Sequence, residues 1–327
     1  MIGSLIELSP LLMVGGLIAG LLIGLTGLGG AVIVTPMLVL VFGVPPSTAV
    51  SSDLVSSAIT KPVGAWVHAR AKTIHWRLAW WLCAGSIPGV LIGSWIFSRI
   101  LQTSGAQGAI KTLLGGVLVL ALVALLVKQF LQRTRRDGTA TAPAQQGSDL
   151  PVRIVPTILV GLVVGILVGT TSVGSGSLVI TALLLLYPLL RTSFLVGTDL
   201  TQAIPLLAVG ALAHAVIGGV DVIIVVSLLI GQIPGVWLGA RISSRFDSKV
   251  LRWLLVALLA CTAATLLGAP VIVAGLVAGV GVVLVVALSI RASRRAAPAK
   301  DSTTGPSHGS STGENRVSGK DGGEPQP

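Results

Sequence analysis

The sequence predicts an all-α polytopic membrane protein made of two inverted repeats of about four to five membrane segments each. Three observations lead to this fold class: an apolar composition, a succession of apolar segments, and an internal duplication. Of the 327 residues, 53% are hydrophobic and only 10% are charged, whereas soluble domains carry about 25% charged residues. A soluble chain of this composition would expose large apolar patches. The composition therefore indicates a lipid bilayer as the surrounding medium.

The formal net charge of +11 does not indicate nucleic acid. The basic residues form short clusters between apolar segments, and no basic domain rich in aromatic residues is present in the sequence. Such clusters are typical of the loops that set the orientation of membrane segments. No lysine or arginine precedes Lys61, which argues against a cleavable signal peptide.

Apolar segments follow one another along most of the chain, and a helix that spans a bilayer needs about 20 such residues. The long candidates are Leu5–Leu25, Leu78–Phe97, Ile110–Phe130, Ile154–Thr170, Val222–Ala240, Leu251–Leu266 and Val271–Ile290, and two with polar residues are Ser47–Trp66 and Ser193–Ile217. Two more, Ala31–Phe42 and Ser177–Leu190, are short, and we expect them to be short spans or broken, re-entrant segments at the Gly-rich junctions. The predicted organisation is a first membrane repeat (1–131), a cytoplasmic linker (132–151), a second repeat (152–267), an additional C-terminal transmembrane helix (268–291) and a disordered cytoplasmic tail (292–327).

The two halves match each other at a nearly constant offset. The matched residues are Gly16, Gly20 and Gly24 with Gly161, Gly165 and Gly169; Asp53 with Asp199; His68 with His214; Pro88 with Pro234; and Gly93 with Gly239. The basic loops of the two halves are out of phase, with Arg70–Arg77 in the first half and Arg241–Arg252 one loop later in the second. Placing both in the cytoplasm makes the repeats antiparallel, with the N-terminus outside and the C-terminus in the cytoplasm. In such proteins the binding site lies near the midplane, where the repeats meet.

Three ionisable residues are candidates for function inside membrane segments: Asp53, Lys61 and Asp199. Intramembrane charges are costly and are retained mainly for function. As repeat mates, the two aspartates are expected to approach one another near the pseudo-twofold axis and to carry protons or orient a substrate. The alternative is that each aspartate caps the start of a helix. Lys61 has no mate, because its partner position is Leu207; it either faces a polar cavity and attracts an anion, or reaches towards the cytoplasmic interface.

Two Gly-rich junctions lie at matched positions before the short segments. They contribute Thr26, Gly27, Gly29 and Gly30 in the first half, and Thr171, Ser172, Gly174, Ser175 and Gly176 in the second. A break of this kind leaves N–H groups free at the start of the next helix, where an oxyanion can bind. The alternative is a helix-packing surface lined with glycine. With Ser52, Asp53, Lys61, Thr198, Asp199 and Gln202, these residues form the predicted substrate-binding set, and no catalytic residue or metal ligand is expected.

The remaining polar and aromatic residues favour structural roles. His68 and His214 lie at segment ends, where capping or interfacial hydrogen bonding is favoured over proton relay. The tryptophans lie mostly near segment ends and are interpreted as interface anchors. Cys83 and Cys261 lie within apolar segments and are interpreted as small buried side chains.

These motifs resemble those of the sulfite exporter TauE/SafE family, also called the four-toluene-sulfonate uptake family of permeases. The resemblance runs from about Gly15 to Leu267, and its carriers are the Gly-x-x-x-Gly-x-x-x-Gly opening, Thr26 to Gly30, Thr35-Pro36, Asp53-Leu54, and Gly197-Thr198-Asp199-Leu200. It implies a permease of the bacterial inner membrane for small anions, often sulfur-containing, such as sulfite or sulfonates, with transport driven by the proton gradient. The second half departs from the first, with Thr181 in place of Pro36, and Ser172 and Ser175 in place of glycines.

The favoured function is therefore a secondary transporter of small anions that works by alternating access, without a cofactor. An intramembrane enzyme is disfavoured, because Gly174-Ser175-Gly176-Ser177 has the wrong spacing for a serine nucleophile of that class. An anion channel and a non-transporting membrane assembly stay as alternatives. The expected partners are a small anion and the lipid bilayer, and a homo-oligomer is left open.

Overall fold

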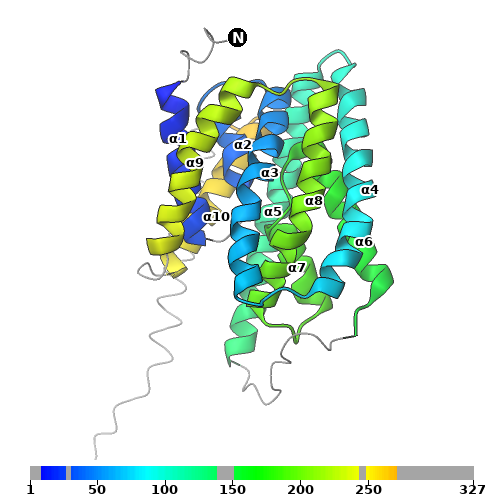
Figure 1. Ribbon diagram of the computed structural model, residues 1–327. Coiled ribbons are helices and arrows are strands. Elements are labelled where there is room, and N and C mark those ends of the chain that lie inside the picture. The colour runs from blue at the N-terminus through cyan, green and yellow to red at the C-terminus, as the bar shows by residue number, and fades with distance from the viewer. Residues whose placement is uncertain (1–8, 27–30, 138–150, 243–247, 271–327) are drawn as a thin grey trace, which may run out of the picture. The chain divides into compact units, whose positions relative to one another are not determined.

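The computed structural model describes residues 9–26, 31–137, 151–242 and 248–270, and within these ranges the chain forms α-helices and no strand (Figure 1). The helices are α1 (Pro10–Thr26), α2 (Ala31–Leu40), α3 (Pro46–Arg70), α4 (Trp76–Leu101), α5 (Ala106–Asp137), α6 (Ile154–Thr171), α7 (Ser177–Leu186), α8 (Thr192–Ile217), α9 (Val222–Ile242) and α10 (Ser248–Leu266). Each predicted segment within the described ranges corresponds to one of these helices. Among the described residues, five helices are long and apolar enough to cross a membrane on their own.

The largest difference from the predicted boundaries is at the end of α5. The helix continues past Leu131, where the linker was expected to begin, and ends at Asp137. A charged, helix-favouring stretch prolongs the apolar segment here, so hydropathy alone places the boundary too early. The C-terminal helix predicted at Val271–Ile290, the predicted tail, and residues 138–150 of the linker lie outside the described residues.

Glycine rows hold together two pairs of helices that come from different halves. Gly85, Gly89 and Gly93 of α4 lie against α6, and a Cβ added at any of them would come closer than 3.0 Å to backbone atoms of that helix. Their repeat mates on α9, Gly231, Gly235 and Gly239, lie against α1 in the same manner. Glycine permits this close approach in membrane helices. Glycines that the sequence pairs as mates therefore form both interfaces, α4 with α6 and α9 with α1.

The two long polar helices, α3 and α8, lie side by side and run antiparallel. Ser51 hydrogen-bonds His214, whereas the side chain of Leu200 lies against Gly64. As the residue number rises along α3, the number of its neighbour on α8 falls. This pair carries all three ionisable residues singled out in the sequence.

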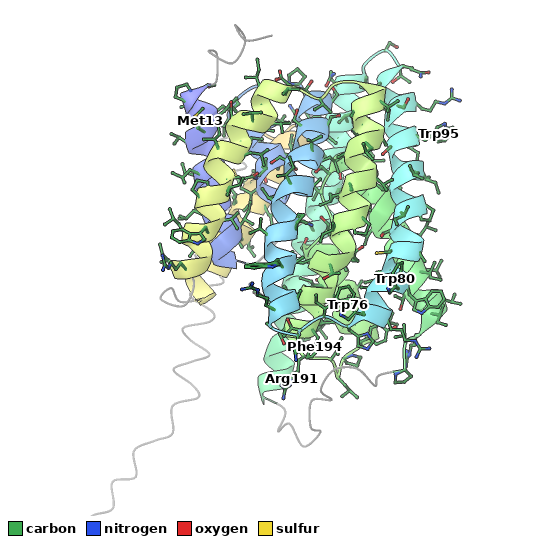
Figure 2. All side chains as sticks on the ribbon, viewed as in Figure 1. Met13, Trp76, Trp80, Trp95, Arg191 and Phe194 are labelled. Atoms are coloured by element: carbon green, nitrogen blue, oxygen red, sulfur yellow. The ribbon has the colours of Figure 1, made fainter. Side chains whose placement is uncertain are left out.

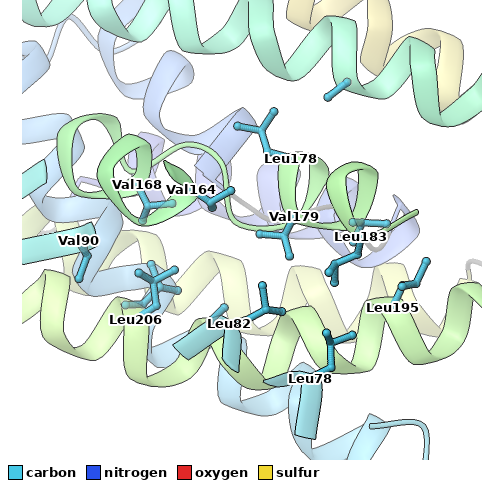
Figure 3. Packing of buried hydrophobic residues seen from close by; sticks show 14 of the residues in the cluster. Leu78, Leu82, Val90, Val164, Val168, Leu178, Val179, Leu183, Leu195 and Leu206 are labelled. Atoms are coloured by element: carbon cyan, nitrogen blue, oxygen red, sulfur yellow. The ribbon is translucent and has the colours of Figure 1, made fainter. Parts of the chain in front are cut away.

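Buried apolar side chains enclose the polar pair, and apolar side chains also cover the outside. One core cluster joins Leu78, Leu82, Val90, Val164, Val168, Leu183, Leu195 and Leu206 from α4, α6, α7 and α8 (Figure 3). On α4, Trp76 and Trp80 lie near one end and Trp95 near the other (Figure 2), and their exposed fractions are 60%, 72% and 59%. Exposed aromatic side chains near both ends of a helix suit the two interfaces of a bilayer.

Candidate functional site

The junction between α6 and α7 is a buried stretch of irregular backbone. Ser172 has a φ of 62°, and Gly174 and Gly176 have φ of 134° and 117°. A non-glycine residue with positive φ is strained, and such strain persists where the surroundings enforce it, often at functional sites. The predicted break between Thr171 and Ser177 is therefore present. Its counterpart in the first half, with Gly27, Gly29 and Gly30, lies outside the described residues, as does the side chain of Thr26.

Asp53 lies in the interior of α3 and is fully buried. Its carboxylate accepts hydrogen bonds from Thr35 Oγ1 at 2.5 Å, Ser172 Oγ at 2.9 Å and Ser57 Oγ at 3.3 Å. The interpretation of Asp53 as a helix cap is wrong, because α3 begins at Pro46. Asp53 instead joins α2 and α3 to the irregular junction of the other half.

Asp199 also lies inside its helix, since α8 begins at Thr192, so the capping interpretation is wrong here too. Gln202 Nε2 donates to Asp199 Oδ1 at 3.2 Å. The backbone N–H of Gly176, directly before α7, also hydrogen-bonds this carboxylate, and Lys61 and Lys128 attract it electrostatically. Asp199 therefore occupies the position at the start of α7 where an oxyanion was expected to bind.

Lys61 is buried, with an exposed fraction of 7%. Its Nζ donates to Ser175 Oγ at 2.5 Å, and it interacts electrostatically with Asp199 and Asp53. The alternative in which Lys61 reaches to the cytoplasmic interface is therefore wrong. A buried cation is tolerated here because it bonds a hydroxyl and interacts electrostatically with two carboxylates.

The two aspartates do not meet at one point, contrary to expectation. Asp199 is next to Leu200, which lies against Gly64, so Asp199 is level with that part of α3. At about 1.5 Å per residue, Gly64 lies about 16 Å along α3 from Asp53. Lys61 lies between the two levels. Antiparallel packing of α3 and α8 produces this separation. Because the two helices run in opposite directions, mates that lie away from the point where the helices cross are at different levels.

Some of the hydrogen bonds between the halves are repeated at the mate positions. Ser56 on α3 donates to Gln232 on α9 at 2.6 Å, and Ser86 on α4 donates to Gln202 on α8 at 3.2 Å. Ser56 is the mate of Gln202, and Ser86 is the mate of Gln232. The same two repeat positions are therefore bonded twice, and in both bonds a serine of the first half donates to a glutamine of the second half.

A second pair of matching hydrogen bonds joins the residue that precedes each aspartate to a loop of the other half. Ser52 Oγ accepts a hydrogen bond from the backbone N–H of Asp221 at 3.1 Å. Thr198 Oγ1 accepts one from the backbone N–H of His75 at 3.0 Å. Ser52 and Thr198, predicted as substrate ligands, thus have a structural bond in this conformation.

We expect Ser52→Ala and Thr198→Val to destabilise the protein by similar amounts. Each change leaves a backbone N–H without its side-chain acceptor, at a cost of about 1–2 kcal/mol. Thermal unfolding of the purified variants in detergent measures the loss. Thr262→Val is the control, because the Thr262 hydroxyl donates only to carbonyls within its own helix. Unequal losses for the two mates would contradict the equivalence of these bonds.

The histidines make structural hydrogen bonds. His214 bridges Ser51 Oγ at 2.9 Å and the carbonyl of Gly169 at 2.8 Å. His68 Nδ1 bonds Thr73 Oγ1 at 2.8 Å. In the part of the chain that the structure describes, no group of three or more His, Cys, Asp or Glu residues is placed to bind a metal.

Sequence reasoning missed three contributors to the site: Thr35, Ser57 and Lys128. Thr35 and Ser57 bond Asp53, and Lys128 attracts Asp199 from α5. Lys128 had a usable signal, a lone lysine near the end of an apolar segment. Thr35 stands in the Thr35-Pro36 motif of the family resemblance but was not assigned to the site. Ser57 had no signal, since nothing in the sequence separates it from serines that bond their own helix.

Comparisons with known proteins agree on one group. The family model described as Sulfite exporter TauE/SafE matches residues 12–266. The probable membrane transporter protein YjnA of Bacillus subtilis is 38% identical over 245 residues, which cover 75% of this chain and 94% of YjnA. A probable membrane transporter protein of Methanocaldococcus jannaschii is 29% identical over 269 residues, covering 77% and 92%. No solved structure matches the chain.

Proposed function

From the premise that this chain belongs to the sulfite exporter TauE/SafE family, we propose that it is a secondary transporter that moves small oxyanions across the cell membrane. The similar proteins are named probable membrane transporters, and the chain is a helical multi-pass membrane protein. Sulfite and sulfonates are the proposed substrates, as the family's name suggests. The proposed location is the bacterial inner membrane, with the N-terminus outside and the C-terminus in the cytoplasm.

The proposed architecture is a pair of inverted repeats. Three features support it: the glycine interfaces occur as repeat mates, two hydrogen bonds between the halves are each repeated at the mate positions, and the mates α3 and α8 run antiparallel. An axis that relates antiparallel mates lies in the plane of the membrane, which is the arrangement of many transporters. Alternating access would then arise from one half moving against the other.

The proposed anion site is formed by Lys61 and the residues at the start of α7. The observation that carries it is the bond from the buried Lys61 to Ser175, beside the N–H of Gly176 and the carboxylate of Asp199. Lys61 supplies positive charge, and the start of α7 supplies N–H donors. Within the described residues, the hydroxyl of Ser177, the first residue of α7, is buried without a hydrogen-bond partner. That hydroxyl is a further donor for an oxyanion.

We propose that Asp199 couples proton binding to anion binding at this site. Its carboxylate accepts a hydrogen bond from the N–H of Gly176 and is attracted by the charge of Lys61. A second anion there would therefore be repelled by the like charge of this carboxylate. Protonation of Asp199 removes the repulsion and releases both groups for the substrate. A proton therefore accompanies the anion in the proposed cycle, with Asp199 on the cytoplasmic side of Lys61 and Asp53 on the external side.

The test is anion uptake into proteoliposomes containing the purified full-length protein. Wild-type uptake of sulfite or a sulfonate is expected to be saturable and to rise as pH falls, because the protonated form of Asp199 admits the anion. Asp199→Asn mimics the protonated carboxyl and is expected to make uptake independent of pH.

Asp221→Asn is the matched control, since Asp221 caps α9 by accepting the N–H groups of Ile223 and Ile224, a role that asparagine can fill. Unchanged transport and unchanged pH dependence in both Asp53→Asn and Asp199→Asn would remove the proton-carrier role. Flux that does not saturate would indicate a channel, and absence of any flux would indicate a non-transporting assembly.

A further inference from the structure

An apolar groove of about 520 Å³ lies between α3 and α9. Val63 and Gly64 line it from α3, and Pro234 and Trp237 line it from α9. Thr60 also lines it, but the Thr60 hydroxyl donates to backbone carbonyls of α3. The groove therefore presents an almost wholly hydrocarbon surface.

The two helices run in the same direction along the groove. The bond from Ser56 to Gln232 joins them before the groove begins, and residue numbers then rise on both sides. The C-terminal ends of α3 and α9 consequently lie at the same end of the groove, as Figure 1 shows.

Each helix carries an arginine stacked on a tryptophan at that end. The guanidinium of Arg70 lies 4.0 Å from the ring centroid of Trp66, and that of Arg241 lies 4.7 Å from the ring centroid of Trp237. Both tryptophans are more than half exposed, at 56% and 58%. Trp237 belongs both to the groove and to the arginine pair, so the apolar surface and the positive charge are continuous.

We propose that this groove binds an anionic phospholipid, with one acyl chain between α3 and α9 and the phosphate held by Arg70 and Arg241. The charge complementarity favours an anionic over a zwitterionic lipid, because the guanidinium groups near the ends of the two helices that line the groove suit a phosphate that carries net negative charge. Tryptophan suits the intervening level, where its ring meets the lipid headgroup region. The hydrocarbon lining excludes a free inorganic anion from the groove itself.

The bound lipid would act on the helix that carries the central lysine. Thr60 and Gly64 flank Lys61 along α3, and both line the groove. An acyl chain there packs against α3 and α9 together, so it is expected to stabilise the contact between them. The proposal of a lipid site rests on the groove and the arginines, and it does not depend on which substrate is transported.

The experiment compares lipids on the detergent-purified, full-length protein. Added phosphatidylglycerol is expected to raise the Tm by roughly 3 °C and to remain bound in native mass spectrometry, whereas phosphatidylcholine does neither. The double variant Arg70→Gln with Arg241→Gln is expected to lose both effects. Val63→Trp, which fills the groove at a position already 53% exposed, is expected to lose them as well.

Arg99→Gln is the matched control, because Arg99 also lies over a tryptophan, at 5.3 Å from the Trp95 ring centroid, but at the far end of α4. This variant is expected to keep the full response to phosphatidylglycerol. Equal responses to the two lipids, or an unchanged response in the double variant, would overturn the proposal. So would an equal Tm shift with soluble glycerol phosphate, since that result needs no acyl chain. For any variant whose Tm without lipid is altered, lipid binding is assessed by native mass spectrometry instead of by the Tm shift.

Discussion

Lys61→Met is expected to reduce anion transport at least about 100-fold, corresponding to about 2.7 kcal/mol. The buried ammonium group is the cation that bonds Ser175 and balances Asp53 and Asp199. Methionine has a similar length and no charge, so an incoming anion would meet two carboxylates without the compensating cation. Initial rates of uptake into proteoliposomes measure the effect.

Two controls separate charge from folding. Lys111→Met makes the same chemical change on α5, away from the site, and is expected to transport normally. Lys61→Arg keeps the charge and is expected to retain part of the activity, because guanidinium geometry differs from that of ammonium. Full transport by Lys61→Met, in protein that elutes as the wild type does from size exclusion, would place the anion elsewhere.

The helices were largely predictable because a bilayer leaves few choices. Backbone groups in hydrocarbon must bond within the helix, so hydropathy alone located α4, α6 and α9 to within a few residues. The duplication predicted which glycines play equivalent roles. The end of α5 was missed because its last turns are charged, and apolar content does not reveal that such residues continue a helix.

The site was predictable in composition but not in geometry. Asp53, Lys61, Ser172, Ser175 and Asp199 were each singled out, and the structure links them through the α6–α7 junction. The levels of the aspartates depend on where α3 crosses α8, a long-range register that no local pattern encodes. The same register decides that Lys61 lies between them, and the hydrogen bond between Ser51 of α3 and His214 of α8 is a polar contact that holds the two helices in it.

Gly89→Ala is expected to destabilise the protein by about 3 kcal/mol or more, the upper end of the range for overpacked sites. A Cβ at Gly89 would come within 3.0 Å of the carbonyl of Leu162 on α6, and backbone atoms cannot turn aside as a side chain can. The α4–α6 interface would have to open along its length, separating the two halves. Thermal unfolding in detergent, followed by fluorescence-detected size exclusion, measures the loss.

Gly116→Ala on α5 provides the contrast that isolates the helix contact from glycine's own properties. A Cβ at Gly116 meets no atom within 4 Å, so this change only improves helix propensity, by about 1 kcal/mol. The same substitution should therefore have opposite signs at the two positions. Gly235→Ala, the mate of Gly89 on α9, should be as damaging as Gly89→Ala, because a Cβ there meets the backbone of α1. A stable Gly89→Ala protein would mean that α4 and α6 can separate without cost, and the glycine rows would then mark a sliding surface between the halves and not a fixed one.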